Sequence, residues 1–349
     1  MIRAGQIGLG GIGSVRRQAL QLSDHMTLSA AADINTDLLC DLPSSVAIYA
    51  EPEELIESDN CDVVIISVPT QFHEELALKA LTAGKHVILE KPMASSLEAC
   101  RRILVAAREN NRLLTMGFNH RYFEAIKDIR ATIGSGKIGA LKYVKGFTGH
   151  TGLSEFKSAW MYDKDIMGGG TLMDNGIHML DLMRYLMGGV TEVSGMIGTE
   201  IWQLDRSEDN AFVHLSSEKG VLGTLHSSWS EWRGYHFYID AYGDRGMVRA
   251  YYAPMFSMVI SLDRPGGKRS ISRNFYPKSI IREKFRGWQS TVVQTFLEEF
   301  ADFSALVRGE SGRTIATAID GYRSIEIPNA VYRSHMEKRT IQLEPNVGH

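Results

Sequence analysis

The sequence predicts an α/β protein that begins with a doubly wound parallel sheet and continues as an α+β domain with a large, mostly antiparallel, open-faced sheet. Three observations lead to this prediction. The 349 residues exceed what one hydrophobic core usually organises, so two domains are expected. The first third of the chain alternates apolar runs with helix-like stretches. From about residue 121, short β-rich runs replace that alternation.

The first 121 residues carry the pattern of a parallel sheet covered by helices. Continuous apolar runs typical of buried strands lie at residues 3–7, 28–32, 63–68, 86–89 and 113–116. Amphipathic stretches that favour helices lie at residues 12–22, 53–58, 74–83 and 96–109. Buried strands that alternate with helices indicate βαβ units. We therefore expect residues 1–121 to form the first domain.

Residues 122–349 follow a different pattern and are expected to form the second domain. Short β-rich runs lie at residues 141–146, 193–197, 211–215, 223–228, 236–242 and 247–251. Turn sequences such as Gly243-Asp244-Arg245-Gly246 favour hairpins between them. Helical stretches are expected at residues 171–187, 291–307 and 314–333. A sheet with an uncovered face can self-associate, so we expect a homodimer or homotetramer formed through it.

The composition excludes several classes of protein. With 38 basic and 41 acidic side chains the net charge is −3, which gives no sign of a nucleic-acid surface. No apolar run reaches the ~18 residues of a membrane span, and the N-terminus lacks the apolar core of a signal peptide. Cys40, Cys61 and Cys100 form no CxxC pair, so neither a disulfide framework nor a metal site is expected. We expect a cytoplasmic protein without nucleic-acid or membrane partners.

A glycine-rich turn, Gly8-Leu9-Gly10-Gly11-Ile12-Gly13, follows the first strand-like run and opens the first helical stretch. That context is the one a dinucleotide-binding fingerprint requires. Gly8 would allow the tight turn, Gly10 the close approach of a pyrophosphate, and Gly13 close packing of the helix. Backbone N–H groups of Gly11 and Ile12 at the helix start would attract the phosphates. An ordinary glycine-rich turn is the alternative.

Asp33 supports the dinucleotide interpretation, because it follows Gly13 at the spacing of about 20 residues that the fingerprint needs. Its carboxylate can accept both ribose hydroxyls and would repel the extra phosphate of NADP, so NAD is expected as the cofactor and NADP is disfavoured. A helix N-cap is the alternative role for Asp33. Other residues at strand ends are expected to flank the cofactor, and these are Ile34, Ser67, Pro69, Thr70 and Glu90.

Two segments carry residues suited to proton transfer. Glu90-Lys91-Pro92 follows a predicted parallel strand, where a lysine beside an oxidised nicotinamide could exchange a proton with a substrate hydroxyl. Asp174 and His178 are four residues apart in the helical stretch, so on an α-helix they share one face. A carboxylate one turn away can orient a histidine that acts as a base. The alternatives are a surface lysine before a helix and a solvated polar helix face.

Together with Gly117-Phe118-Asn119-His120-Arg121-Tyr122 and the glycine run of residues 168–170, these motifs resemble those of the Gfo/Idh/MocA oxidoreductase family. The resemblance covers essentially the whole chain. It implies an N-terminal Rossmann domain, NAD or NADP as cofactor, and a sugar or polyol as small-molecule substrate. It also implies that Lys91, Asp174 and His178 form the catalytic group. The family's tryptophan–arginine pair stands here as Trp160-Met161, which weakens an anionic-substrate interpretation.

The mechanism we expect is oxidation of a secondary alcohol to a ketone by hydride transfer to NAD, or its reverse. His178 removes the hydroxyl proton, Asp174 orients the imidazole, and Lys91 hydrogen-bonds the same oxygen or relays the proton. Whether His178 or Lys91 is the base stays open. Further residues expected to contact the substrate are Asn119, Arg121, His150, Trp160 and Tyr162, besides the catalytic group.

Other functions remain open at this point. A glycosidase-type enzyme on the same scaffold would oxidise a sugar transiently, and an NAD sensor would bind without catalysis. A metal hydrolase could use Asp174, His178 and Asp181 as ligands, but it would leave the glycine turn unexplained. The basic stretch of residues 268–286 is interpreted as a solvated, mobile loop, with a phosphate-binding role as the alternative.

Overall fold

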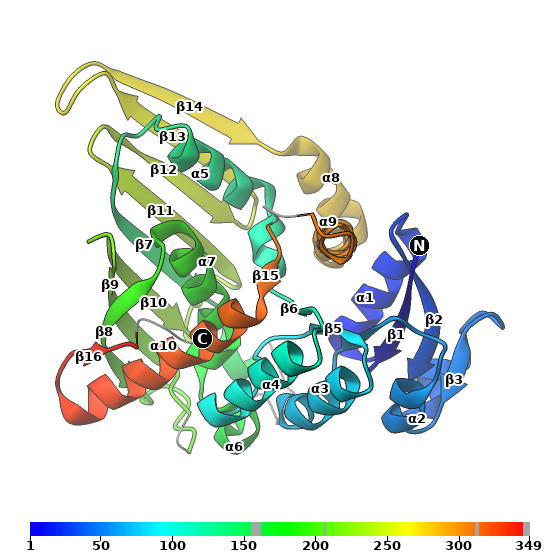
Figure 1. The fold of residues 1–349 in the computed structure, drawn as a ribbon. Coiled ribbons are helices and arrows are strands. Elements are labelled where there is room, and N and C mark those ends of the chain that lie inside the picture. The colour runs from blue at the N-terminus through cyan, green and yellow to red at the C-terminus, as the bar shows by residue number, and fades with distance from the viewer. Residues whose placement is uncertain (155–161, 206, 311–313, 345–349) are drawn as a thin grey trace. The chain divides into compact units, whose positions relative to one another are not determined.

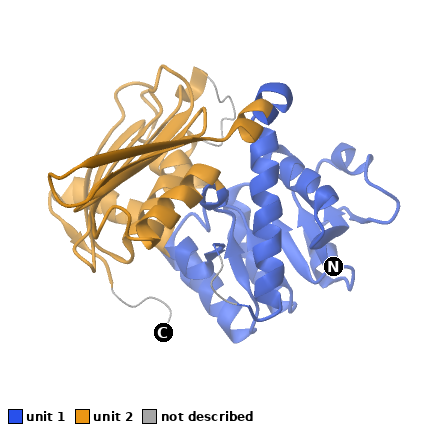
Figure 2. Cartoon of the chain, turned by 90° about the horizontal axis from the view of Figure 1, so that it is seen from above, with its two compact units in different colours: residues 1–122, 282–322, 348 blue, residues 123–281, 323–347, 349 orange. Residues whose placement is uncertain are grey.

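The computed structural model describes residues 1–154, 162–205, 207–310 and 314–344 (Figure 1). The chain divides into two compact units, coloured separately in Figure 2. Within the described residues, unit 1 contains Met1–Tyr122 and Arg282–Tyr322, and unit 2 contains Phe123–Ile281 and residues 323–344. No helix in the described part of the chain has the length and apolar character needed to cross a bilayer.

Unit 1 is built on a sheet that has seven strands within the described residues, in the order β15-β6-β5-β4-β1-β2-β3. The strands are β1 (Ile2–Ile7), β2 (Met26–Ala32), β3 (Ala47–Tyr49), β4 (Val63–Ile66), β5 (His86–Leu89), β6 (Leu114–Met116) and β15 (Ala316–Thr317). All pair in parallel except β15, which is antiparallel to β6. The four residues of β4 are fully buried and apolar, as expected for a central parallel strand. The predicted doubly wound sheet is thus confirmed.

Helices cover both faces of this sheet (Figure 1). They are α1 (Gly11–Leu22), α2 (Pro52–Glu57), α3 (His73–Thr82), α4 (Leu97–Glu109) and α9 (Gln289–Val307). Helix α1 packs against α9 on one face, and α3 packs against α2 and α4 on the other. The helices begin where local chemistry favours it: Ser96 caps α4 by accepting a hydrogen bond from Ala99 N, and Pro52 opens α2.

The division at residue 121 needs a correction, because residues 282–322 return to unit 1. Helix α9 carries Phe296, Phe300 and Phe303, which are buried in one cluster with Val15 and Ala19 of α1. Strand β15 then extends the parallel sheet at its β6 edge. These apolar side chains find their partners on a helix far away in the sequence, so the second unit is not a continuous segment.

Unit 2 is built on a sheet with nine strands in the described residues, in the order β14-β13-β12-β11-β7-β10-β9-β8-β16. The strands are β7 (Leu141–Gly149), β8 (Val190–Gly198), β9 (Asn210–Ser217), β10 (Leu222–Ser228), β11 (His236–Gly243), β12 (Gly246–Tyr252), β13 (Phe256–Leu262), β14 (Arg269–Phe275) and β16 (Ile341–Gln342). Only the β7–β10 pair is parallel among the described pairs of this sheet. The predicted, mostly antiparallel sheet is therefore confirmed.

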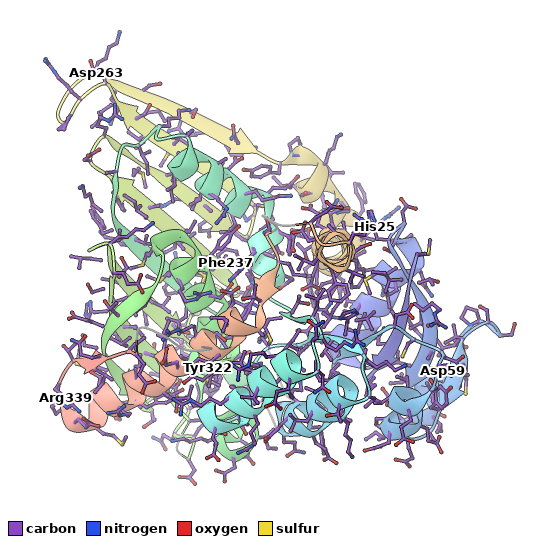
Figure 3. All side chains as sticks on the ribbon, in the orientation of Figure 1. His25, Asp59, Phe237, Asp263, Tyr322 and Arg339 are labelled. Atoms are coloured by element: carbon purple, nitrogen blue, oxygen red, sulfur yellow. The ribbon has the colours of Figure 1, made fainter. Side chains whose placement is uncertain are left out.

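The helices of unit 2 are α5 (Glu124–Gly134), α6 (Lys164–Met167) and α7 (Ile177–Met187), with a π-helical turn, Leu172–Gly176, before α7. Helices α8 (Pro277–Arg286) and α10 (Ala318–Glu337) each begin in one unit and end in the other. Helix α5 packs on β12 and β13, and α7 packs on β7 and β10. Side chains of these helices and of the inner sheet face form the core, including Phe237, which Figure 3 labels.

The basic stretch of residues 268–286 is not a loop, which corrects the sequence interpretation. It forms the edge strand β14 and helix α8, separated by Tyr276. All residues of β14 are exposed on at least part of their surface, because the strand lies at the sheet edge. The charged side chains that suggested a loop are therefore those of a solvated edge strand and helix.

Candidate active site

Two glycines of the turn between β1 and α1 are required by the fold itself. Gly8 has a φ of +87°, and a Cβ atom there would lie 2.3 Å from the carbonyl oxygen of Ser67. A Cβ on Gly13 would lie 2.2 Å from the carbonyl oxygen of Gly8. Gly8 thus lets the β1 end approach the β4 end, and Gly13 lets α1 begin directly against the turn.

Gly10 is different, because the described residues leave room for a side chain there. Its backbone is extended, with φ −75° and ψ −179°, and a Cβ would find its nearest atom, Leu38 Cδ1, at 4.0 Å. Gly10 is the N-cap of α1 without a side-chain cap, and the first turn of α1 carries no acid. Open space before an uncapped helix start suits a pyrophosphate that must approach the backbone closely.

Asp33 lies against this turn. Its Oδ2 accepts a 2.6 Å hydrogen bond from Leu9 N, and its Oδ1 accepts one of 2.8 Å from Asn35 N. Each oxygen retains a second lone pair, which a ribose hydroxyl can use. The N-cap of the following short helix is Asn35 and not Asp33, so the alternative role considered for Asp33 is assigned to its neighbour. Ile34, next to it, is 91% exposed.

The segment after β4 lies beside the glycine turn. Ser67 N donates a 2.9 Å hydrogen bond to Ile7 O, which places Ser67 at the adjacent ends of the paired strands β1 and β4. Pro69 precedes a short 3-10 helix that begins at Thr70, whose side chain is buried. Helices α1 and α3, which follow β1 and β4, lie on opposite faces of the sheet. Such a reversal point is where doubly wound sheets bind ligands.

The Lys91 turn, defined as Glu90–Pro92, follows β5, and its Lys91–Pro92 peptide is cis. The Glu90 carboxylate points into unit 1, where it accepts a 2.5 Å hydrogen bond from the buried Arg16. Arg16 in turn donates a 2.6 Å bond to Glu299 and lies 4.0 Å from the centre of the Phe296 ring. The Glu90 side chain therefore anchors the turn to α1 and α9, while Lys91 is half-buried.

His120 is a residue near Lys91 that the sequence reasoning did not select. Burial, with a smaller contribution from the positive charge of Lys91, lowers the pKa of His120 to about 3. Its Nδ1 lies 3.1 Å from Asn119 Oδ1. A histidine of low pKa stays neutral over the working range of most enzymes, so this one adds no charge beside the lysine. Its position after a parallel strand, in an Asn-His-Arg run, is the only signal the sequence offered.

Two predicted substrate contacts at the end of β6 are engaged within unit 1. Asn119 donates a 3.3 Å hydrogen bond to Thr295 Oγ1. The Arg121 guanidinium is buried, donates to Thr314 O at 3.3 Å and forms an ion pair of 3.3 Å with Asp320. Arg121 therefore ties the residues before α5 to the start of α10.

Unit 2 brings Asp174 together with His150 and Trp229. Gly152 N donates a 2.9 Å hydrogen bond to His150 Nδ1, so that nitrogen carries no proton and His150 Nε2 must be the protonated one. His150 Nε2 donates to Asp174 Oδ2 at 3.0 Å, and Trp229 Nε1 donates to the same oxygen at 3.1 Å. Two N–H donors on one oxygen hold the Asp174 carboxyl group in one orientation, and hydrogen bonds of this kind favour its ionised form.

The segment that carries Asp174 is held by Glu208, whose carboxylate accepts hydrogen bonds from Gly170 N at 2.8 Å and Leu172 N at 2.9 Å. Tyr332 donates to the same carboxylate at 3.0 Å. Burial raises the pKa of Glu208. A Cβ on Gly170 would lie 2.1 Å from Glu208 O, so this glycine serves close packing. Glu208 acts as a remote cap for the turn that precedes α7.

The helical geometry between Asp174 and His178 differs from the prediction. Residues 172–176 form a π-helical turn and α7 begins at Ile177, so the α-helical spacing argument does not apply across this junction. Asp174 and Asp181 are 5% and 1% exposed, which excludes the solvated-face alternative for both, and His178 is half-buried.

The remaining predicted contact that can be placed is Tyr162, whose ring packs edge-on against Trp229 with 5.0 Å between ring centres. Its backbone oxygen accepts a hydrogen bond of 2.9 Å from Ser207. Trp160 lies outside the described residues. Among the residues that are described, no group of three or more His, Cys, Asp or Glu side chains gathers as a metal site.

Comparisons with known proteins agree with this architecture. A family model described as an oxidoreductase family with an NAD-binding Rossmann fold matches residues 2–118, and a GFO/IDH/MocA C-terminal domain matches residues 126–249. Myo-inositol 2-dehydrogenase of Thermotoga maritima is 29% identical, and the match covers 99% of this chain and 100% of that protein. The scyllo-inositol 2-dehydrogenase (NAD(+)) of Bacillus subtilis is 27% identical, with 84% and 81% covered.

Solved structures share the complete fold. An NAD-binding oxidoreductase from Klebsiella pneumoniae matches with a TM-score of 0.86 and 21% identity, covering 99% of this chain and 100% of that one. Levoglucosan dehydrogenase in complex with NADH and L-sorbose matches with a TM-score of 0.84 and 22% identity, covering 98% and 99%. The predicted resemblance is confirmed, and the chain belongs to the GFO/IDH/MocA family of oxidoreductases, with an NAD-binding Rossmann fold as its N-terminal part.

Proposed function

We propose that this protein is an NAD-dependent dehydrogenase that interconverts a secondary alcohol and a ketone on a cyclic polyol or sugar. The observation that carries the proposal is the buried carboxyl group of Asp174, which is held in one orientation by N–H donors from His150 and Trp229. Burying a carboxyl group costs free energy even when it is hydrogen-bonded, which makes Asp174 a candidate functional group, and a fixed carboxylate beside a substrate hydroxyl serves an alcohol dehydrogenase.

NAD is the proposed cofactor, in preference to NADP. Gly10 and the uncapped start of α1 would hold the pyrophosphate, and Asp33 would hold the ribose hydroxyls. A carboxylate in that position disfavours the additional phosphate of NADP. Bound NAD would supply the hydride acceptor. Ser67, Pro69 and Thr70 would line the cofactor through the segment after β4, and the exposed Ile34 would offer its apolar side chain beside the ribose.

The chain's own residues would then handle the substrate hydroxyl. We assign Lys91 and His178 to its proton: one removes the proton as the carbonyl forms, and the other hydrogen-bonds the oxygen. Asp174 would stabilise the positive charge that the base acquires. Tyr162, which packs on Trp229, is proposed to contact a further hydroxyl group. Both ring nitrogens of His150 are engaged by Gly152 and Asp174, so His150 is proposed to act on the substrate by orienting Asp174. Removal of Lys91 or His178 should lower kcat by about 10²–10⁴-fold.

The substrate class follows from the relatives and from the polar lining. Two relatives are named as dehydrogenases of inositols, which are cyclic polyols. A polyol presents several hydroxyls of similar chemistry, and discrimination among them needs several fixed polar groups. In unit 2 the carboxyl group of Asp174, fixed by Trp229, is one such group.

The test is a panel of inositols, aldoses and glycosides with NAD, followed by the absorbance of NADH. The expected result is net NADH from at least one inositol or aldose, lost in Lys91→Ala and His178→Ala while NAD still binds. Release of an aglycone without net NADH would support the glycosidase-type alternative instead. NAD binding without turnover of any compound would support a sensor.

Assembly and location complete the proposal. We propose a homodimer or homotetramer formed through the outer face of the unit 2 sheet, where Met196, Phe212 and Leu222 are exposed. We also propose a cytoplasmic location, which the three free thiols of Cys40, Cys61 and Cys100 support because they would persist in a reducing compartment. Sedimentation at micromolar concentration tests the first statement.

A further inference from the structure

His73 is a buried histidine that makes two close contacts through its ring. It begins α3 and is 1% exposed. Its Nδ1 lies 2.7 Å from the carbonyl oxygen of Pro92, and its Nε2 lies 2.9 Å from the carbonyl oxygen of Val68. Carbonyl oxygens only accept hydrogen bonds, so each contact requires a proton on the ring nitrogen.

The two carbonyls belong to the two segments proposed to line the cofactor. Val68 lies between Ser67 and Pro69 in the segment after β4, and Pro92 closes the Lys91 turn after β5. Strands β4 and β5 are paired neighbours in the sheet, so the imidazole spans two adjacent strand ends. One peptide bond separates Lys91 from the carbonyl-bearing residue Pro92. The contact therefore acts on the backbone that carries the proposed catalytic lysine.

The Lys91 turn is also held at its start. Glu90 anchors it through Arg16, and Lys91 N is 3.3 Å from Glu90 Oε2, a long hydrogen bond. The Glu90 anchor fixes the start of the turn, whereas His73 fixes its end. Lys91 lies between these two anchors. Both contacts are therefore needed to fix the direction in which its side chain extends from the backbone.

We infer that His73 is a positioning residue for Lys91: its Nδ1–H holds the carbonyl of Pro92 and so fixes the orientation of the Lys91 turn toward the reacting hydroxyl. The inference rests on the proposed function of Lys91. Burial lowers the pKa of His73, against the opposing effects of the two carbonyls and of the Glu90 carboxylate. A neutral ring carries one N–H, and we assign that proton to the shorter contact, to Pro92. The contact to Val68 requires the second proton, which only the imidazolium carries.

Two isosteric substitutions separate the two contacts. In His73→Asn the side-chain amide nitrogen takes the place of Nδ1, and in His73→Gln it takes the place of Nε2. We expect His73→Asn to keep kcat within about fivefold of the wild type, and His73→Gln to lose about 10²-fold, since a misplacement of about 1 Å costs that much. The KM for NAD should change by less than about threefold in both, because the glycine turn is untouched.

His86→Gln is the matched control. His86 begins β5, at the end of the strand opposite the Lys91 turn, and its Nδ1 accepts a 3.0 Å bond from Leu113 N. This substitution also alters a backbone tether in unit 1, so it should lower the melting temperature as His73→Gln does while leaving kcat unchanged. Equal losses of kcat in His73→Asn and His73→Gln, or a fall in the Gln variant no larger than in the control, would overturn the inference.

A readout without turnover separates this inference from the proposed function. Chemical acylation of lysines in the apo protein, followed by mass spectrometry, reports the reactivity of Lys91 relative to Lys79. We expect the reactivity of Lys91 relative to Lys79 to change in His73→Gln and to keep its wild-type value in His73→Asn. This expectation holds whether or not any polyol is oxidised. Should neither variant fold, a neutron structure of the wild type decides, because a deuteron on His73 Nδ1 is required and a bare Nδ1 refutes the tether.

Discussion

The pair Gly10 and Gly13 gives the sharpest test of the cofactor site, because the same substitution should act on binding at one position and on folding at the other. In Gly10→Ala, the new methyl meets no atom closer than Leu38 Cδ1 at 4.0 Å, and the backbone is extended. The weaker N-cap preference of alanine lowers the free energy of unfolding by about 0.5–1 kcal/mol. The smaller conformational entropy of the unfolded chain raises it by about 0.4–1 kcal/mol. The stability of the fold should therefore change by less than about 1 kcal/mol.

The cost of Gly10→Ala should appear in NAD affinity. A methyl group placed where the pyrophosphate approaches is an overpacked contact, worth about 1–3 kcal/mol. That corresponds to a Kd for NAD raised roughly 5–150-fold, since about 1.4 kcal/mol is tenfold. Isothermal titration calorimetry of the apo protein measures the Kd, and a thermal melt measures the stability.

Gly13→Ala should behave in the opposite way. Its Cβ would lie 2.2 Å from Gly8 O, which forces the turn and α1 apart. We expect a loss of about 1–3 kcal/mol in stability, or roughly 2–4 °C in Tm for each kcal/mol in a domain of about 150–250 residues. The reasoning is refuted if Gly10→Ala binds NAD with wild-type affinity, or if it melts as early as Gly13→Ala.

Three further outcomes are expected. Asp33→Ala should raise the Kd for NAD by about tenfold while changing that for NADP little, because the repulsion of the extra phosphate disappears; an unchanged ratio of the two Kd values would contradict the role of Asp33. Trp229→Phe removes one N–H bond from Asp174 and should lower kcat by about tenfold or more, since a bond to a charged group contributes about 1.5–3 kcal/mol. Trp202→Phe, whose indole binds only the backbone of Trp229, is its control and should leave kcat unaltered. Burial raises the pKa of Glu299 from 4.5 to about 6. Folding therefore favours its protonated form, and stability present below pH 4.5 should fall by about 2 kcal/mol as the pH rises to 6. Urea unfolding of Glu299→Gln should lack that slope, and a slope equal to the wild type would argue against a raised pKa.

The parallel sheet could be predicted closely because its strands are short, continuous apolar runs. Strand β5 has the predicted bounds, and β4 is shorter by the two residues that continue toward Pro69. Strand β3 was missed although its residues, Ala47-Ile48-Tyr49, are apolar, because three residues are too few to show a strand pattern. Strand β14 was missed because charged and polar side chains fill an exposed edge. Strand β13 was missed although five of its seven residues, in the sequence FSMVISL, are apolar.

The sequence could point to individual candidate residues of the site, but not to the hydrogen bonds that join them. The sequence pointed to Asp33 and the glycine turn, because the dinucleotide motif is defined by the spacing of its residues along the chain. The contacts of Asp174 with His150 and Trp229 join the π-helical turn to the residues that follow β7 and β10, and no periodicity in the sequence predicts them. The π-helical turn likewise follows from packing of the glycine run around Glu208, which an α-helical spacing rule does not anticipate. His73 and His120 were missed because single histidines give no pattern.

The central claim, hydride transfer from a carbinol carbon to NAD, is tested most directly by isotope transfer. An inositol that carries deuterium on every ring carbon is incubated with the enzyme and NAD, and the NADH formed is analysed by mass spectrometry. The account predicts one deuterium per NADH, with formation abolished in Lys91→Ala. NADH without deuterium, or the same yield from Lys91→Ala, would contradict it.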